Sequence, residues 1–237
     1  MTALAVAGRI LRGLRGDRRT VGLVVVVPAF LLFLFGEVFA RTEAVAPILL
    51  AVFVFFLTYL LTAVGFLREQ TSGTLERLLA SPITRRSLVG GYVLGFGVLA
   101  AVQSVVLLAS SVAFLDVSFA HGVAPFLALE LLGALTALGV GVLLSLFADN
   151  EFQALQFVPV VITPQVILGG TFRPVSELPT YLEWAARAMP VTYLIDGMEY
   201  VVDDRGTAGD AWTAVAALGA FAVISLAAAV AAVKRTR

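Results

Sequence analysis

Residues 88–115 read LVGGYVLGFGVLAAVQSVVLLASSVAFL, a run of 28 residues without a charged side chain. A transmembrane helix needs about 20 apolar residues to cross a hydrocarbon core of roughly 30 Å. The run therefore predicts a helix that spans a membrane.

Similar apolar segments lie on both sides of this run. They cover residues 21–39, 47–67, 123–147, 155–171 and 211–233. The segment at 155–171 is the shortest and carries Pro159 and Pro164, which interrupt helical hydrogen bonding. We expect an all-α integral membrane protein with six transmembrane helices, forming a single domain over residues 1–237.

Composition agrees with a protein that is dissolved in lipid. Of 237 residues, 60% are hydrophobic and 14% are charged, and the mean hydropathy is +0.99. Soluble domains carry about 45–50% apolar and roughly 25% charged residues. The 16 basic and 16 acidic residues balance, so no nucleic-acid partner is indicated. With no cysteine and one histidine, the chain offers no thiol chemistry and no histidine cluster for a metal.

The basic residues predict the orientation in the membrane, because loops facing the cytoplasm are enriched in Lys and Arg. If both termini are cytoplasmic, twelve basic residues lie inside and four outside. The inner set is Arg9, Arg12, Arg15, Arg18, Arg19, Arg68, Arg77, Arg85, Arg86, Lys234, Arg235 and Arg237; the outer set is Arg41, Arg173, Arg187 and Arg205. Five spans would place the basic C-terminal tail outside. A cleaved signal peptide is the alternative for the N-terminus, but its apolar run exceeds the usual 7–15 residues.

The tail before the first span has an amphipathic pattern. Leu4, Ala7, Leu11 and Leu14 recur at helical spacing, with arginines elsewhere around the helix. Such a helix is typical of the membrane interface, with its arginines toward anionic headgroups. The alternative is that the arginines only fix the orientation.

Residues 68–87, REQTSGTLERLLASPITRRS, predict a short cytoplasmic helix between the second and third spans. Gly73 and Thr74 suit its start, and Ser81-Pro82 ends it because a residue before proline leaves the helical region. Leu75, Leu78 and Leu79 form one apolar face. That face needs a surface to cover it, which is the protein's own spans, the lipid interface or a soluble partner.

Two motifs together resemble the type-2 ABC exporter permeases. The first is Arg68-Glu69 followed by the run from Gly73 to Leu79 and by Ser81-Pro82. The second runs from Phe152 through Gly169-Gly170-Thr171-Phe172 and Leu178-Pro179 to Pro190-Val191-Thr192-Tyr193. The resemblance covers about half the chain. It implies a coupling helix that docks into an ATPase subunit, through Glu69, Gly73, Thr74, Leu75, Glu76, Arg77, Leu78, Ser81 and Pro82.

The stretch between the fifth and sixth spans is too mixed to cross a membrane, and the resemblance implies an outer re-entrant helical hairpin there. Thr180 and Glu183 have the spacing of a capping box that opens a short helix. Pro190 then breaks the chain before a second helix from Tyr193 to Tyr200. Aromatic side chains with polar atoms favour the membrane–water boundary. We expect Pro179, Trp184, Pro190 and Tyr193 to shape this hairpin; an ordinary surface loop is the alternative.

Four polar residues within the spans are candidates for a transport pathway, because polar groups in a membrane are costly. They are Glu130, Glu37, Gln103 and Gln165. Headgroup contact for Glu37 and interhelical hydrogen bonds for the glutamines are the alternatives. Gly91 and Gly95 form a GxxxG pair, and Gly133, Ala137 and Gly141 repeat small residues; both patterns favour close helix packing, within the chain or between two chains.

No nucleotide-binding P-loop is present in the sequence, and no catalytic, cofactor or metal site is indicated. The resemblance therefore implies a non-enzymatic permease in the cytoplasmic membrane of a prokaryote, powered by ATP and Mg²⁺ on a separate ABC ATPase. It implies two ATPase copies, a second permease subunit and membrane lipid as partners, with a drug-like, lipid or other amphipathic substrate. The alternative is a secondary transporter or channel without an ATPase, and the two differ in whether transport needs ATP.

Overall fold

The computed structural model describes residues 2–39, 42–80 and 83–233, and within these ranges the chain is helical with no strand. The long helices are α2 (Arg18–Val38), α3 (Thr42–Thr71), α5 (Arg85–Leu115), α6 (Val123–Ser145) and α11 (Ala208–Ala232). The shorter elements are α1 (Ala3–Gly16), α4 (Thr74–Ala80), α7 (Glu151–Phe157), η1 (Val158–Ile162), α8 (Thr163–Val166), η2 (Ile167–Thr171), η3 (Val175–Glu177), α9 (Thr180–Arg187) and α10 (Pro190–Asp203).

The six predicted spans are confirmed: six helical segments are long and apolar enough to cross a membrane. They are Val21–Val38, Val45–Thr71, Arg85–Leu115, Val123–Ser145, Glu151–Thr171 and Ala208–Ala232. The second extends past its predicted end at residue 67, because the helix continues through the polar residues Arg68, Glu69 and Gln70. The all-α membrane fold follows from the apolar runs.

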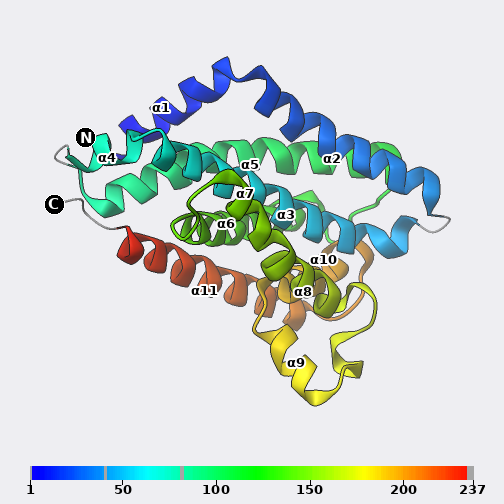
Figure 1. Cartoon of the computed structure of the whole chain (residues 1–237). Helices are drawn as coiled ribbons and strands as arrows, with labels where there is room; N and C mark the ends of the chain where they lie inside the picture. The colour runs from blue at the N-terminus through cyan, green and yellow to red at the C-terminus, as the bar shows by residue number, and fades with distance from the viewer. Residues whose placement is uncertain (1, 40–41, 81–82, 234–237) are drawn as a thin grey trace.

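Helix α6 lies at the centre of the bundle and packs against α3, α5, α10 and α11 (Figure 1). Glycines permit its closest contacts. A side chain at Gly141 would approach the backbone of Tyr59 in α3 to 3.0 Å, and one at Gly133 would meet Leu194 of α10 at 2.6 Å. The predicted small-residue pattern therefore serves packing within the chain.

The fifth span is not a continuous α-helix. It runs through α7, η1, α8 and η2, and η1 and η2 are π-helical. Pro159 and Pro164 lack the backbone N–H that an α-helix needs, so hydrogen bonding shifts to the wider π turn around them. Gly170 then takes a φ of +103°, which ends the span. The two prolines that marked this segment in the sequence therefore account for its irregular backbone.

Helix α1 lies along α5 at the end of the bundle that also carries α4, which we call the α4 end (Figure 1). Gly91 and Gly95 of α5 form a groove that contacts α1. A side chain at Gly91 would meet Val6 at 2.5 Å, and one at Gly95 would meet Ile10 at 3.0 Å. The residues of α1 that are buried against the bundle are Val6, Ala7 and Ile10, whereas Leu4 of the predicted apolar face is 74% exposed. The docked face follows the glycine groove of α5.

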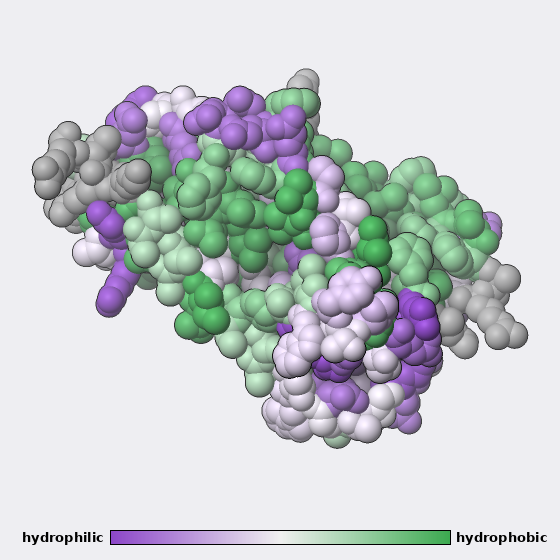
Figure 2. Space-filling view, turned by 60° about the horizontal axis from the view of Figure 1, so that its bottom comes forward, coloured by the Kyte–Doolittle hydropathy of each residue, from purple (hydrophilic) through white to green (hydrophobic). Residues whose placement is uncertain are grey.

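The opposite end of the bundle, called the α10 end, contains α9 and α10. Helix α10 packs among α3, α6 and α11, while α9 projects from the bundle (Figure 1). The backbone N–H groups of Ala120 and His121 donate to the last carbonyl oxygens of α10, which ties it to the loop before α6. Hydrophobic residues cover much of the flank of the molecule, and paler and hydrophilic residues cover the projecting lobe (Figure 2).

Candidate functional site

The predicted short helix between the second and third spans is present as α4. It begins after Gly73, whose φ of +69° lies in the left-handed region that glycine adopts without strain. Thr74 is its first residue, and the Thr74 hydroxyl lies 2.9 Å from that of Ser72. Ser81 and Pro82, predicted to end the helix, lie outside the described residues. The sharp turn at Gly73 sets α4 apart from α3.

The two described leucines of α4 face the bundle. Leu75 and Leu78 are buried in a cluster to which α1, α3, α5, α6 and α11 all contribute, including Phe66, Leu88 and Val142. Of the three surfaces that could cover these leucines, the one that covers them in the structure belongs to the protein's own spans. Glu76 and Arg77 are exposed on the opposite side of α4. This leaves a short charged face at the α4 end.

Glu69, predicted as a coupling residue, is bound to α1. Its carboxylate accepts hydrogen bonds from Nη1 and Nη2 of Arg9 at 3.1 and 2.8 Å, and Arg9 Nη2 also donates to the hydroxyl of Tyr92 at 3.2 Å. This group joins α1, α3 and α5 beside α4. Sequence reasoning missed Arg9 and Tyr92, because Arg9 is one of several tail arginines and Tyr92 reads as a core aromatic.

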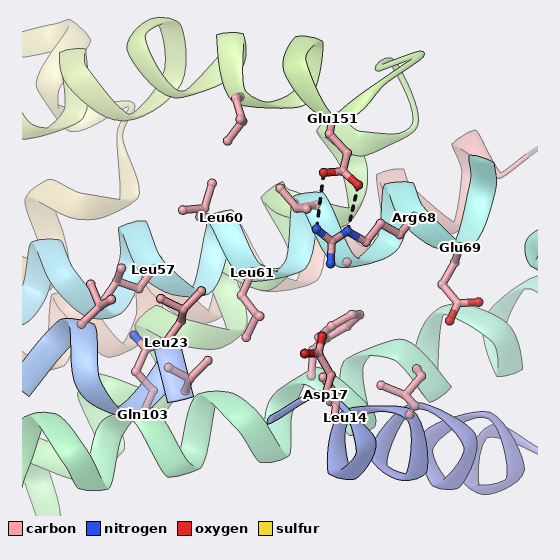
Figure 3. A pocket seen from close by; sticks show the side chains of 18 of the residues that line it. Leu14, Asp17, Leu23, Leu57, Leu60, Leu61, Arg68, Glu69, Gln103 and Glu151 are labelled. Atoms are coloured by element: carbon pink, nitrogen blue, oxygen red, sulfur yellow. Dashed lines mark hydrogen bonds and ion pairs between the residues drawn. The ribbon is translucent and has the colours of Figure 1, made fainter. Parts of the chain in front are cut away.

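A pocket of about 780 Å³ opens beside this group (Figure 3). Its walls come from α1, α2, α3, α5 and α7. Apolar side chains such as Val27, Leu60 and Phe96 line most of it, and Arg9, Asp17, Arg68, Glu69 and Glu151 line the part nearest the α4 end. Pockets of about 300–1,000 Å³ with apolar walls and a few polar groups are typical of small-molecule sites. The pocket is therefore amphipathic, with a charged part and an apolar part.

The four pathway candidates lie in different surroundings. Gln103 lines the pocket, is 1% exposed, and donates from Nε2 to the carbonyl oxygen of Phe53 at 3.4 Å. Glu130 is fully buried inside the helix bundle, next to the hydroxyl of Ser104 in α5. Gln165 donates to Val161 in the same span, and Glu37 is exposed near the end of α2. Among these four, Gln103 is the residue that the structure brings to the pocket.

The predicted hairpin residues lie in and around α9 and α10, but their local roles differ from the prediction. The capping box at Thr180 and Glu183 was wrong: Pro179 precedes the helix, no side chain caps it, and Glu183 instead pairs with Arg187. Pro190 does not break the chain before the second helix but occupies its first turn, where a missing N–H costs nothing.

The two aromatic residues that were predicted to shape the hairpin, Trp184 and Tyr193, differ in their contacts. Trp184 is 71% exposed on α9. The hydroxyl of Tyr193, in contrast, donates to the carbonyl oxygen of Arg187 at 2.8 Å and joins the two helices. Tyr193 therefore stabilises the hairpin, while Trp184 is free to contact its surroundings.

A second pocket of about 320 Å³ lies at the α10 end, between α10 and the segments around it. It contains Asp196, whose pKa rises to about 6 through burial and through the nearby charges of Glu199 and Asp210. Burial likewise raises the pKa of Glu199. Within the described residues, no three acidic or histidine side chains come together as a metal site.

The sequence matches a known family. The sequence pattern of the ABC-2 type transporter family matches residues 3–202, which include α4, the large pocket and the α9–α10 hairpin. The chain belongs to the ABC-2 type transporter family. The resemblance seen in the two sequence motifs is therefore confirmed. The first motif lies at the α4 end, and the second runs from α7 through the fifth span to α10.

Several curated relatives of this ABC-2 chain are permeases. It is 28% identical over 152 residues to the probable multidrug ABC transporter permease YbhR of Escherichia coli, covering 64% of this chain and 41% of the relative. The inner membrane transport permease YadH of E. coli is 28% identical over 163 residues, 68% and 63% of the two chains. ABC transporter G family member 20 of Dictyostelium discoideum is 28% identical over 142 residues, which cover 60% of this chain and 20% of the relative. The matched part thus spans less than two thirds of each relative.

Proposed function

We propose that this chain is the membrane-spanning permease subunit of an ATP-driven exporter of amphipathic molecules, and that α4 docks onto a separate ABC ATPase. The observation that carries the proposal is the packing of α4 against the helix bundle. Leu75 and Leu78 fix the helix in a cluster shared by five other helices, while Glu76 and Arg77 remain exposed for a partner. Force applied to such a helix reaches all five helices, because packed side chains transmit displacement.

The α4 end is proposed to face the cytoplasm, because it carries the excess of basic residues. An ATPase there has access to α4. The chain has no P-loop, so ATP and Mg²⁺ belong to the partner. We further propose that the chain works in the cytoplasmic membrane of a prokaryote, surrounded by lipid, together with a second permease subunit and two copies of the ATPase. This part of the proposal rests on the family membership.

The large pocket is proposed as one wall of the transport pathway. It has an apolar part, and a charged part at the end where α4 lies, so substrate binding and ATPase docking occur on adjacent elements. Gln103 supplies a polar group in its interior. The names of the relatives support drug-like substrates, since one is called a multidrug permease and another, from Bacillus subtilis, a linearmycin resistance permease.

Reconstitution tests this function. The full chain is placed in lipid vesicles with an ABC ATPase that co-purifies with it, and uptake of fluorescent drug-like substrates into inside-out vesicles is measured. We expect uptake that requires ATP, persists when ionophores abolish ion gradients, and falls when an ATPase inactivated in its P-loop lysine is used. Uptake driven by an ion gradient without the ATPase would instead support a secondary transporter.

A further inference from the structure

A buried polar side chain lines the apolar part of the large pocket. Gln103 of α5 is 1% exposed and belongs to the pocket wall. Its Nε2 atom donates to the carbonyl oxygen of Phe53 at 3.4 Å, and its side chain makes no other hydrogen bond with the part of the chain that the structure describes. The side-chain oxygen Oε1, an acceptor with two lone pairs, is therefore free to bind a donor from a ligand in the pocket.

Gln103 lies far from the charged part of the pocket. In Figure 3, Gln103 and Leu57 lie at one end and Arg68 lies at the other. Phe53, to which Gln103 is bonded, precedes Arg68 by 15 residues in α3, which is about 22 Å at 1.5 Å per residue. Apolar side chains such as Leu60 line the pocket between the two ends. The pocket is thus elongated, with a polar group at each end.

A plain hydrocarbon chain does not complete this pocket. Apolar surroundings leave a polar group without hydrogen bonds, which costs free energy. A hydrocarbon chain beside Gln103 leaves its Oε1 atom without a donor, whereas a chain that carries a hydroxyl or an amide N–H at that depth supplies one. About 16–18 carbon atoms cover the distance from the charged part to Gln103, because an extended chain advances about 1.2 Å per bond.

We propose that the pocket binds elongated amphiphiles that carry a hydrogen-bond donor, a hydroxyl or an amide N–H, in their hydrocarbon portion, and that Gln103 selects them by accepting this hydrogen bond. The polar head group lies at the charged part of the pocket, and the donor lies about 16–18 carbon atoms away. The proposal rests on the proposed function, because it names the substrate class of the same pocket. The selection is independent of the charge of the head group.

Photolabelling of the full chain in phosphatidylcholine vesicles tests this selection without the ATPase. Two probes share a maltose head group, a diazirine in mid-chain and a length of about 16 carbon atoms, but one ends in a methyl group and the other in a hydroxyl. Labelled peptides are mapped by mass spectrometry. Labelling of α3 is divided by that of the exposed Val223 and Ile224 in α11, which corrects for partitioning into lipid. We expect this ratio to be about two to ten times higher for the hydroxyl probe.

Two glutamine variants form a matched pair. Gln103→Met removes the amide and keeps an unbranched side chain, so it should abolish the preference. Gln165→Met is the control and should retain it, because Gln165 is 5% exposed, donates to the carbonyl oxygen of Val161 and is not among the residues that line the pocket. A third probe, with its hydroxyl next to the head group, should label the unmodified chain no more than the methyl probe does.

Equal ratios for the methyl-ended and hydroxyl-ended probes would show that plain hydrocarbon chains fill the pocket equally well, and would overturn the selection. A preference that survives Gln103→Met, one that is lost equally in Gln165→Met, or an equal gain with the third probe would also overturn it. Selective labelling of a chain without ATP-dependent transport would overturn the proposed function and leave the site standing. Transport without selective labelling would do the reverse.

Discussion

The guanidinium group of Arg9 in α1 holds the carboxylate of Glu69 in α3 through two hydrogen bonds, although the two residues lie 60 positions apart in the sequence. Glu69 lies four residues before Gly73, where the chain turns into α4. The pair therefore fixes the end of α3 from which α4 departs, and it makes α1 a support for the proposed coupling helix.

Replacing Arg9 by Ala is expected to lower both thermal stability and ATP-dependent transport, because Glu69 and Tyr92 lose their shared partner. In a double-mutant cycle with Glu69→Ala, the two changes should be coupled by about 1 kcal/mol. Melting temperature in detergent and transport in vesicles measure these effects. Arg12→Ala is the control, since Arg12 bonds to the Gly8 carbonyl of its own helix. Additive effects of Arg9→Ala and Glu69→Ala would contradict the role of the pair.

The two faces of α4 should respond differently to substitution. Combining Glu76→Lys with Arg77→Glu changes exposed charges, so we expect ATPase binding and transport to fall while the melting temperature is unchanged. Leu78→Ala leaves a cavity in the cluster beneath α4 and should cost about 2–3 kcal/mol of stability. Co-purification with the ATPase and thermal melting distinguish the two. Normal ATPase binding by the charge-changed protein would exclude these two side chains from the docking surface.

Gly91→Val is expected to displace α1 from α5, because the new side chain collides with Val6 and the Ala3 carbonyl. Gly97→Val is a matched control in the same helix, since nothing lies within 4 Å of the added atom. Trypsin should then cleave after Arg12 and Arg15 faster in the Gly91 variant only. Equal cleavage rates in both variants would show that α1 is not held by this groove.

Stability should decrease as the pH rises through the acidic range. Burial and the charges of Glu199 and Asp210 raise the pKa of Asp196 from 3.8 to about 6, against an opposing effect of Arg187. Between these values the folded state binds a proton that the unfolded state has lost, so the free energy of unfolding falls with rising pH.

A higher melting temperature is therefore expected at pH 5 than at pH 7.5. Asp196→Asn should weaken this dependence and raise the melting temperature at pH 7.5 by about 2–6 °C. Glu199 retains its own contribution, since burial also raises its pKa. Glu177→Gln is the control and should leave the dependence as it is. A pH profile of Asp196→Asn that matches the unmodified chain would show that this carboxylate is not responsible.

The spans and α4 were predictable because they depend on local signals. An uncharged run longer than 20 residues specifies a span, and Gly73 with the following leucines specifies a short helix. The capping box was predicted at the wrong helix, because two segments carry a threonine followed three residues later by an acidic residue. Thr207 and Asp210 form the capping box that opens α11, whereas at Thr180 the preceding Pro179 takes the capping position and Glu183 binds Arg187.

The pocket could not be predicted, because it depends on contacts between distant segments. Nothing in the sequence indicates that Arg68 meets Glu151, 83 positions away, or that Asp17 faces the same group. The orientation of α1 could not be predicted for the same reason. Its sequence offers two apolar faces, and the groove at Gly91 and Gly95 determines that Val6 and Ile10 are the buried ones.

The first span, α2, exposes much of its apolar surface, including Leu23, Val26 and Phe30, and it approaches α5 closely at Gly36. A helix in lipid satisfies its own backbone hydrogen bonds, so α2 can insert and persist before the later helices assemble against it. Its stability comes from the bilayer more than from its neighbours. Detergent extraction therefore removes the main support of α2, and a lipid nanodisc is the environment in which the pocket wall that it forms will be preserved.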